Sequence, residues 1–358
     1  MNINLTPPLV SRMNSYNISP LPISACSTLT ACGLGNQDLY EALLQGQHCL
    51  QTLSLFDIDF PTYCGEIQDR FLPIIPEQHR AFSSRNTRIA LAALNNPDDG
   101  LRSALQRAIE LYGPHRIGIV LGTSTSAIHE TENAYQSLAS GQGVPPTFSL
   151  PKQHAWVATA HFLKAELQLE GPCYMISTAC SSSSKALASA QRLISAGVCD
   201  AVLTGGVDSL CRLTINGFNS LDIMSEQPCT PLDKDRCGIN IGEGAGLILL
   251  EKPHDDLTDC VHLRGCGESS DAHHMTAPHP QGSGAILAMQ QALKQAEIAA
   301  KDIDYVNLHA TGTVLNDRSE MLAMDHIFNP ELHCSGTKGL TGHTLGAAGG
   351  IETIITWL

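Results

Sequence analysis

The amino-acid sequence predicts an α/β protein, because short apolar runs alternate with helical patterns along the chain. Strand-like runs cover residues 116–122, 201–204 and 246–250, and helical patterns cover residues 101–112 and 285–300. A chain of 358 residues, 43% of them apolar, can bury one large core or the cores of two closely packed halves. We therefore expect sheets that are covered by helices.

Proline-containing segments mark two boundaries in the chain. Residues 1–21 contain three prolines and are expected to form a loose leader. The first residues have no apolar stretch of the kind found in a secretory signal. A proline followed by a charged, polar run at residues 252–256 indicates a second boundary inside the chain.

The composition excludes two classes of protein. A net charge of −14 offers no broad basic face to the phosphates of a nucleic acid. The sequence has no run of eighteen apolar residues, so we expect no membrane span. Its thirteen cysteines are an odd number without a C-x-x-C pair, which favours reduced thiols. We therefore expect a cytoplasmic protein.

Cys180 lies between a predicted strand and a predicted helix. Residues 173–176 form a short apolar run, and after the four serines at 181–184 apolar residues recur at helical spacing. The positive end of that helix would favour the thiolate of Cys180, which is then a candidate nucleophile. The alternative is a plain buried cysteine, because cysteine is among the residues most often found in protein cores.

Two histidines follow in turn-forming segments. His309 comes after the strand-like run 306–308, and His343 lies in a glycine-rich segment five residues after Lys338. Each histidine alone is more often a hydrogen-bonded structural residue. A single cysteine with distant histidines is nevertheless the pattern of a cysteine nucleophile whose partners meet it in the folded protein.

These motifs resemble those of the β-ketoacyl synthases, the condensing enzymes of fatty-acid and polyketide assembly. The resemblance extends from residue 23 to residue 358. Besides the cysteine and histidine motifs it includes four short segments, at residues 32–35, 204–208, 231–236 and 242–246. The resemblance implies the thiolase fold: two similar halves, here residues 22–250 and 251–358, in a layered αβαβα arrangement.

The same resemblance implies roles for five residues. Cys180 would accept the acyl group, and His309 and His343 would complete a Cys-His-His set. Lys338 and Glu320 match the supporting polar residues of the family. For Glu320 the alternative is an ordinary polar residue near the start of a helix.

Within the family that the sequence resembles, initiating synthases pair the cysteine with a histidine and an asparagine. Two histidines, as here, imply an elongating synthase. Segments 267–282 and 216–221 resemble, within the family, the ketosynthases of bacterial aryl-polyene clusters. By resemblance, an acyl chain passes from acyl carrier protein to Cys180. A malonyl thioester then loses carbon dioxide, and the resulting carbanion attacks the acyl-cysteine. Two neutral imidazoles would hold the enolate oxygen of the malonyl unit.

Two alternatives to this function remain open. A non-catalytic partner subunit, such as a chain-length factor, would lack the nucleophile, so Cys180 argues against it. A thiolase would use acyl-CoA and a second catalytic cysteine, for which the sequence shows no motif near its end. No cofactor is expected. No metal site is expected either, because the cluster of Cys266, His273, His274 and His279 lies in a proline-rigid loop without the spacing of zinc ligands.

Acyl carrier proteins are acidic, and a chain with a net charge of −14 would repel them at long range. Binding therefore requires a local basic patch on this chain. The candidates are Arg80, Arg85 and Arg88, with Lys152 as a weaker one, although a solvated helix face would explain them equally well. The resemblance to this family implies a dimer, so we expect either an identical subunit or a nucleophile-free relative as partner.

One departure from the family pattern lies at the end of the sequence. The family continues into a last strand and a Gly-Phe-Gly-Gly turn, which contributes to the acyl oxyanion hole. This sequence ends at Leu358, fifteen residues after His343. Because residues 351–358 read as an apolar helix cut short, we expect that the C-terminal half is incomplete here.

Overall fold

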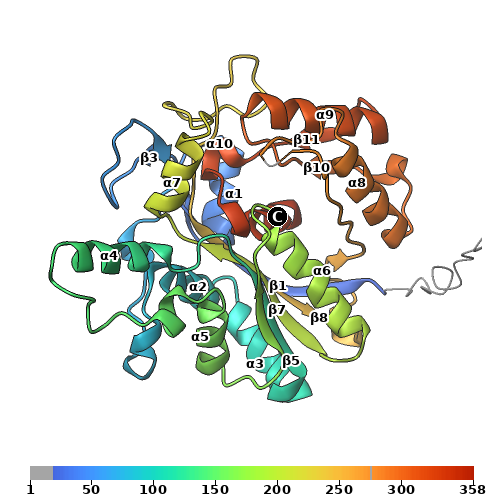
Figure 1. Ribbon diagram of the computed structural model, residues 1–358. Helices are drawn as coiled ribbons and strands as arrows, with labels where there is room; N and C mark the ends of the chain where they lie inside the picture. The colour runs from blue at the N-terminus through green and yellow to red at the C-terminus, as the bar shows by residue number, and fades with distance from the viewer. Residues whose placement is uncertain (1–18, 275) are drawn as a thin grey trace, which may run out of the picture.

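The computed structural model of the chain describes residues 19–274 and 276–358 (Figure 1). Most of the predicted leader lies outside the described residues. Strand β1 (Leu21–Thr30) begins at the last residue of that leader. No helix in the described ranges is both long enough and apolar enough to cross a membrane.

The N-terminal half contains one mixed sheet. Its strands lie in the order β2 (Gly33–Leu34), β1, β8 (Gly244–Glu251), β7 (Ala201–Asp208), β5 (Ile117–Gly122) and β6 (Cys173–Ile176), and β9 (His262–Leu263) pairs with β1. Strand β5 is parallel to both neighbours, whereas β8 is antiparallel to both β1 and β7. The central strands are buried on both faces, which explains their continuous apolar sequences.

Helices cover both faces of this sheet. On one face lie α2 (Arg85–Asn95), α3 (Leu101–Tyr112) and α5 (Ala158–Glu166), packed on the larger core cluster. On the other face lie α6 (Ser182–Ser195) and α11 (Ala348–Trp357), which pack on a second cluster. The helices α6 and α11 approach closely because Gly349 has no side chain: a Cβ there would lie 2.1 Å from Ser184 Oγ.

The C-terminal half adds two further layers. Strands β10 (Tyr305–Asn307) and β11 (His333–Ser335) form a parallel pair, which in the described part of the chain is the whole sheet of this half. Helices α8 (Ser283–Ala296) and α9 (Val314–Ile327) cover it. Figure 1 shows α8 and α9 on the opposite side of the molecule from α2, α3 and α5, with α6 between them. This is the predicted αβαβα order.

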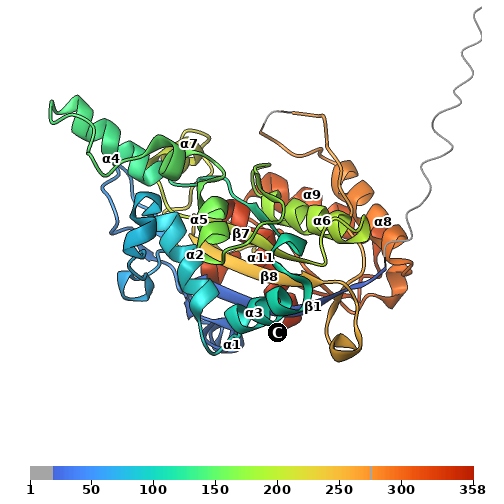
Figure 2. The same cartoon turned by 90° about the horizontal axis from the view of Figure 1, so that it is seen from below.

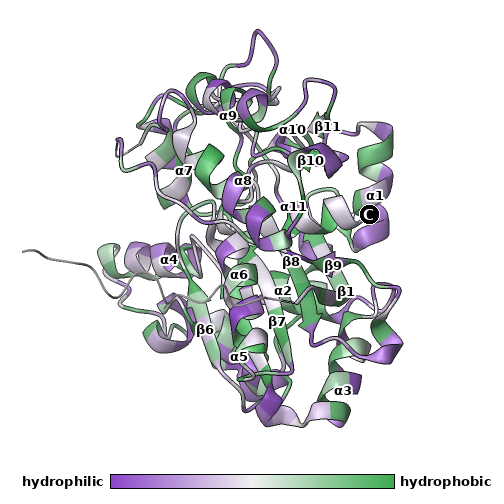
Figure 3. Cartoon of the chain, turned by 90° about the vertical axis from the view of Figure 1, so that its right-hand side faces the viewer, coloured by the Kyte–Doolittle hydropathy of each residue, from purple (hydrophilic) through white to green (hydrophobic). Residues whose placement is uncertain are grey.

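The remaining elements surround this frame. They are α1 (Asn36–Gln45), α4 (Ile128–Ala139), α7 (Arg212–Asn219), α10 (Lys338–Thr341) and the short strand pair β3 (Gln51–Thr52) and β4 (Tyr63–Cys64). Helix α4 projects at one end of the molecule, far from α8 (Figure 2). Apolar residues concentrate in the sheet strands and polar residues on the outer helices (Figure 3).

Two details differ from the sequence-based expectations. The helix predicted over 285–300 ends at Ala296, because the next residue, Glu297, adopts a left-handed conformation with φ 55°. Cys32 and Cys49 form a disulfide, so the expectation of reduced thiols is wrong for this pair. The other eleven cysteines, all within the described residues, are free.

Candidate active site

Three turns bring Cys180, His309 and His343 to one place. Cys180 lies between β6 and α6, His309 follows β10, and His343 follows α10. Each turn contains a non-glycine residue with positive φ: Ala179 (53°), Ala310 (33°) and Leu345 (50°). Such backbone strain is held only where the surrounding fold enforces it, and it concentrates at functional sites. Three of the nine described non-glycine residues with positive φ therefore lie in the turns that carry the sequence motifs.

The three side chains are in contact distance. His343 Nε2 lies 3.0 Å from Cys180 Sγ. The rings of His309 and His343 are 5.1 Å apart, edge to face, and the sulfur and both imidazoles offer atoms that all lie within 4.8 Å of one another. All three residues line a cavity of about 380 Å³, together with Phe218 and Thr311. The structure thus assembles the Cys-His-His set that the sequence predicts.

The tautomer of His343 is fixed by the backbone. The N–H of Leu345 donates a hydrogen bond of 3.2 Å to His343 Nδ1, so Nδ1 is the acceptor nitrogen. The proton of the neutral ring therefore sits on Nε2, which donates toward the sulfur of Cys180. Burial, and secondarily the charge of Lys338, hold the pKa of both His309 and His343 well below the usual value. Both rings are neutral donors at physiological pH, as predicted for an enolate-binding pair.

Cys180 does not have the low pKa that its helix position predicts. Burial of the sulfur is the dominant effect, and it raises the pKa of the thiol to about 11. Lys338 acts in the opposite direction but is outweighed. Burial thus opposes the predicted thiolate and favours the thiol form of Cys180 at neutral pH.

This raised pKa gives a direct prediction for chemical modification. Because only the thiolate reacts, the rate of Cys180 alkylation by iodoacetamide is expected to rise about tenfold per pH unit from pH 7 to 10. The measurement is the loss of the unmodified intact mass with time, with Cys180→Ala defining the background from other cysteines. A rate that already levels off below pH 8 would contradict the raised pKa.

Lys338 is buried at 2% exposure and makes two charge-assisted contacts. Its Nζ donates to the carbonyl oxygen of His309 and forms an ion pair with Glu352. Burial raises the pKa of the Glu352 carboxyl. Glu352 is a residue that our sequence reasoning missed, although it is the one charged residue in the apolar segment 351–358.

Glu320 holds the backbone of the His309 turn. Its carboxylate accepts hydrogen bonds from the N–H of His309 (2.6 Å) and from the N–H of Ala310 (2.7 Å). Burial raises the pKa of this carboxyl. The contacts are with backbone rather than with the sulfur, so Glu320 is a positioning residue and not an ordinary polar residue of the helix.

Asp208 ties two further loops to the site. Its buried carboxylate accepts from the N–H groups of Ser124 (2.8 Å), Thr125 (2.8 Å) and Gly346 (2.5 Å), and burial raises its pKa. Ser124 in turn donates through Oγ to the carbonyl of Ala179, the residue before Cys180. The family motif at 204–208 signalled this region, but the sequence did not show which side chain acts.

The structure corrects two of the three carrier-contact arginines. Arg85 is buried and pairs with Glu243 and Asp69, so it cannot meet a carrier protein. Arg88 is half-buried, and its guanidinium donates to the carbonyls of Leu72 and Pro73. Arg80 remains a candidate, since its side chain is 65% exposed.

The chemistry of the three site residues argues against a bound metal ion. Within the described residues they form the one cluster with the donor types and spacing for a metal, and the histidines of the 273–279 loop form none. A metal on His343 Nε2 would need the ring proton on Nδ1, where Leu345 already donates. The residues present therefore fit hydrogen-bond donation better than metal binding.

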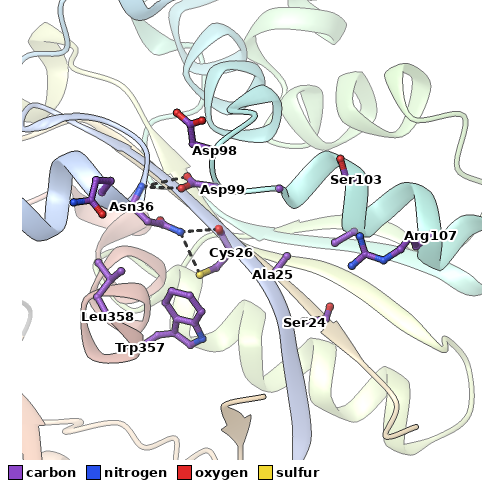
Figure 4. A pocket seen from close by; sticks show the side chains of 13 residues that line it. Ser24, Ala25, Cys26, Asn36, Asp98, Asp99, Ser103, Arg107, Trp357 and Leu358 are labelled. Atoms are coloured by element: carbon purple, nitrogen blue, oxygen red, sulfur yellow. Dashed lines mark hydrogen bonds between the residues drawn. The ribbon is translucent and has the colours of Figure 1, made fainter. Parts of the chain in front are cut away.

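A larger hollow lies elsewhere and contains no predicted site residue. It has a volume of about 710 Å³. It lies beside strand β1, the end of α11 and the start of α3 (Figure 4). Asn36 is one of the polar residues that line it. The backbone N–H of Asn36 donates to Asp99, and its side-chain amide donates to the carbonyl of Cys26. The converging side chains of Cys180, His309 and His343 therefore identify the candidate active site.

Comparison with known proteins identifies the family. The model of the beta-ketoacyl synthase N-terminal domain matches residues 19–256, and the model of the C-terminal domain matches residues 261–358. The chain belongs to the beta-ketoacyl synthase family. Members of this family are condensing acyltransferases, and the thiolase fold that the sequence implied is confirmed.

Named relatives of this synthase are similar over most of the chain. The mitochondrial 3-oxoacyl-[acyl-carrier-protein] synthase of Arabidopsis thaliana is 34% identical over 98% of the chain and 83% of the relative. The chloroplastic synthase II of the same plant is 30% identical over 91% of the chain, but the match spans only 63% of that relative.

Solved structures agree with the sequence relatives. A ketosynthase in complex with its chain length factor, from Xenorhabdus doucetiae, superposes with a TM-score of 0.87 at 39% identity, over 94% of this chain and 83% of that one. The ishigamide ketosynthase/chain length factor gives a TM-score of 0.83 at 25% identity, over 94% of this chain and 84% of that one.

Proposed function

We propose that this synthase condenses an acyl group with a malonyl unit, both delivered as thioesters of acyl carrier protein. The observation that carries the proposal is the Nε2–H of His343, aimed at Cys180 Sγ from 3.0 Å with the His309 ring beside it. A donor pair next to a nucleophilic sulfur serves both an acyl-cysteine and an enolate. Cys180, His309 and His343 are the proposed catalytic residues.

Acyl transfer is the first step. The sulfur of Cys180 attacks the carbonyl carbon of the acyl thioester, a new C–S bond forms, and the bond to the pantetheine sulfur breaks. The proton of the Cys180 thiol passes to the departing pantetheine sulfur. No net proton is released, which suits a thiol with a raised pKa.

Decarboxylation is the second step. The bond between the malonyl carboxylate and the α-carbon breaks, carbon dioxide leaves, and the electron pair moves toward the thioester oxygen as an enolate. The Nε2–H of His343, with His309, holds that oxygen. The carbanion then attacks the acyl-cysteine carbonyl, a new C–C bond forms, and the C–S bond to Cys180 breaks. The sulfur leaves as a thiolate and takes up one proton from solvent.

Lys338 and Glu320 are the proposed supporting residues. Lys338 fixes the His309 carbonyl and supplies positive charge, and Glu320 fixes the N–H groups of the same turn. The position of His309 is thus set from both sides of its backbone.

We also propose a chain-length-factor-like subunit as partner, in a fatty-acid or polyketide system, with an identical subunit as the second possibility. The similarity to two ketosynthases whose structures include a chain length factor supports it. The resemblance of segments 267–282 and 216–221 to aryl-polyene ketosynthases supports an aryl-polyene pathway. Co-expression with a candidate factor followed by size-exclusion chromatography tests the pairing.

A cytoplasmic location is a further part of the proposal. Eleven of the thirteen cysteines are free, which agrees with a reducing compartment. Named relatives are chloroplastic and mitochondrial in one plant, so the family as such fixes no compartment. Fractionation of the producing cell with an antibody to this chain would decide.

Intact-mass measurement after incubation with an acylated carrier protein tests the function. The wild-type protein is expected to gain the acyl mass, and Cys180→Ala is expected to gain none. Acyl mass on neither protein would favour the non-catalytic partner-subunit alternative. The convergence of Cys180, His309 and His343 in one cavity argues against a non-catalytic subunit.

A second cysteine at the site allows the thiolase alternative to be tested. Cys237 lines the same cavity as Cys180, and its Sγ lies 3.1 Å from Ser225 Oγ. A thiolase needs a second cysteine as base, whereas the proposed synthase does not. Cys237→Ser is therefore expected to keep the condensation rate within about twofold of wild type. A loss comparable to that of Cys180→Ala would favour the thiolase.

Arg80, the carrier-contact arginine that is exposed in the structure, gives another prediction. Arg80→Glu is expected to weaken carrier-protein binding, and most strongly at low salt, because the interaction is between exposed charges. Surface plasmon resonance at two salt concentrations measures it. Arg107→Glu on helix α3 has the same charge change at another exposed site and serves as the control. An equal loss in both variants would remove the assignment.

A further inference from the structure

The disulfide between Cys32 and Cys49 closes a loop around helix α1. The two cysteines are 17 residues apart, and both are half-buried at the molecular surface. Cys32 follows β1, and Cys49 follows α1. The other eleven cysteines are free thiols, so this pair is distinct in the chain.

His48 and Cys49 form hydrogen bonds with the short helix α10. The N–H of Cys49 donates to the carbonyl of Leu340 at 3.1 Å, and His48 Nδ1 lies 2.8 Å from the carbonyl of Gly339. Two consecutive carbonyls of α10 are therefore held by residues next to, or part of, the disulfide. The N–H groups of Gly46 and Gln47 also donate to the carbonyls of Leu43 and Ala42, so the disulfide is the covalent tie of a segment that is otherwise held by hydrogen bonds.

Helix α10 carries the groups that order the active site. Lys338 is its first residue, and its Nζ reaches the His309 carbonyl and Glu352. His343 follows α10 after a single glycine. A shift of α10 would therefore move both the buried cation and the imidazole that contacts Cys180.

Cys32 contacts residues near the Lys338–Glu352 pair through a different part of the structure. It packs against the buried cluster of Leu39, Ala347 and Ile351, which joins α1 to the start of α11. Ile351 directly precedes Glu352, the partner of Lys338. Both cysteines of the pair thus contact an element that positions the Lys338–Glu352 pair.

We propose that the Cys32–Cys49 disulfide is a redox-sensitive staple that holds α10 in place, so that its reduction slows condensation. Reduction by a dithiol breaks the S–S bond, delivers two electrons and two protons to the two sulfurs, and converts the dithiol to its own disulfide. Exchange with a low-molecular-weight disulfide restores the bond. A single, partly exposed disulfide among free thiols is the arrangement of a redox-responsive pair rather than of a disulfide-stabilised scaffold.

The activity readout of this staple rests on the proposed function, but its structural readout does not. Hydrogen exchange of the amides in residues 338–343 is measured in the full-length Cys180→Ala protein, which removes oxidation of the nucleophile. Reduction is expected to speed this exchange about fivefold or more, while exchange in α3 stays unchanged. Peptide mapping after alkylation confirms which thiols were released. Unchanged exchange at 338–343 on full reduction of Cys32 and Cys49 would overturn the staple.

The rate of malonyl decarboxylation in the protein with Cys180 intact is the second readout. It is expected to fall about fivefold on reduction. The variant Cys32→Ser/Cys49→Ser is expected to show the low rate in all redox buffers, and Cys334→Ser, which changes an exposed free cysteine, is expected to respond like wild type. A redox response that persists in Cys32→Ser/Cys49→Ser would overturn the proposal. Faster exchange with no decarboxylation in any form would instead contradict the proposed function and leave the staple standing.

Discussion

Replacing His343 by alanine is expected to abolish malonyl decarboxylation while acyl transfer to Cys180 continues. The Nε2–H of His343 is the donor fixed by Leu345. We expect the charged enolate oxygen to depend on this donor more than the neutral acyl carbonyl does, because hydrogen bonds to charged acceptors are stronger. Loss of one such donor raises the barrier by about 2.7–4 kcal/mol, a decrease of about 10²–10³ in rate.

Two assays on the same variant separate the steps. Release of labelled carbon dioxide from malonyl carrier protein reports decarboxylation, and intact mass reports acylation of Cys180. His326→Ala, on the exposed side of α9, is the matched control and is expected to behave as wild type in both assays. If acylation fails in His343→Ala while decarboxylation survives, the division of roles is wrong.

Replacing Lys338 by methionine is expected to damage both stability and catalysis. The substitution leaves the half-buried carboxylate of Glu352 without its cation, and removing one partner of a fully buried pair costs about 3–5 kcal/mol, which is an upper bound here. It also removes the donor to the His309 carbonyl. Since Lys338 lowers the pKa of Cys180, the pKa of that thiol is expected to rise further in the variant.

A double variant distinguishes folding from function. Lys338→Met/Glu352→Leu removes both charges, so most of the lost unfolding free energy is expected to return in urea titrations. Decarboxylation is expected to stay low, because the positive charge and the contact with the His309 carbonyl remain absent. Recovery of the full rate in the double variant would show that Lys338 has no role beyond charge balance.

The local elements followed from the sequence because their signals are local. The apolar run at 173–176 and the helix over 101–112 have the bounds that their sequences predict. Helix α6 begins at Ser182, among the serines that mark a helix start. The convergence of Cys180 with two distant histidines was inferred from motifs that resemble a family, and the fold then brings these residues together.

The errors arose where burial decides the chemistry. Arg85 reads as a cation on a polar helix stretch, but in the fold it meets Glu243, which lies 158 residues away. The helix start predicts an acidic thiol at Cys180, whereas burial of the sulfur raises its pKa. In both cases a short-range pattern was outweighed by desolvation, which depends on the whole fold.

By itself the sequence determined the α/β class, the places of the main strands and helices, and the identity of the nucleophile candidate with its two histidines. Only the tertiary structure decided the tautomer of His343, the protonation of Cys180, and the pairing of Lys338 with Glu352 and of Cys32 with Cys49. The physical reason is that periodicity and turn chemistry are written into neighbouring residues. Hydrogen-bond partners and the exclusion of water are contributed by segments that meet only when the chain has folded.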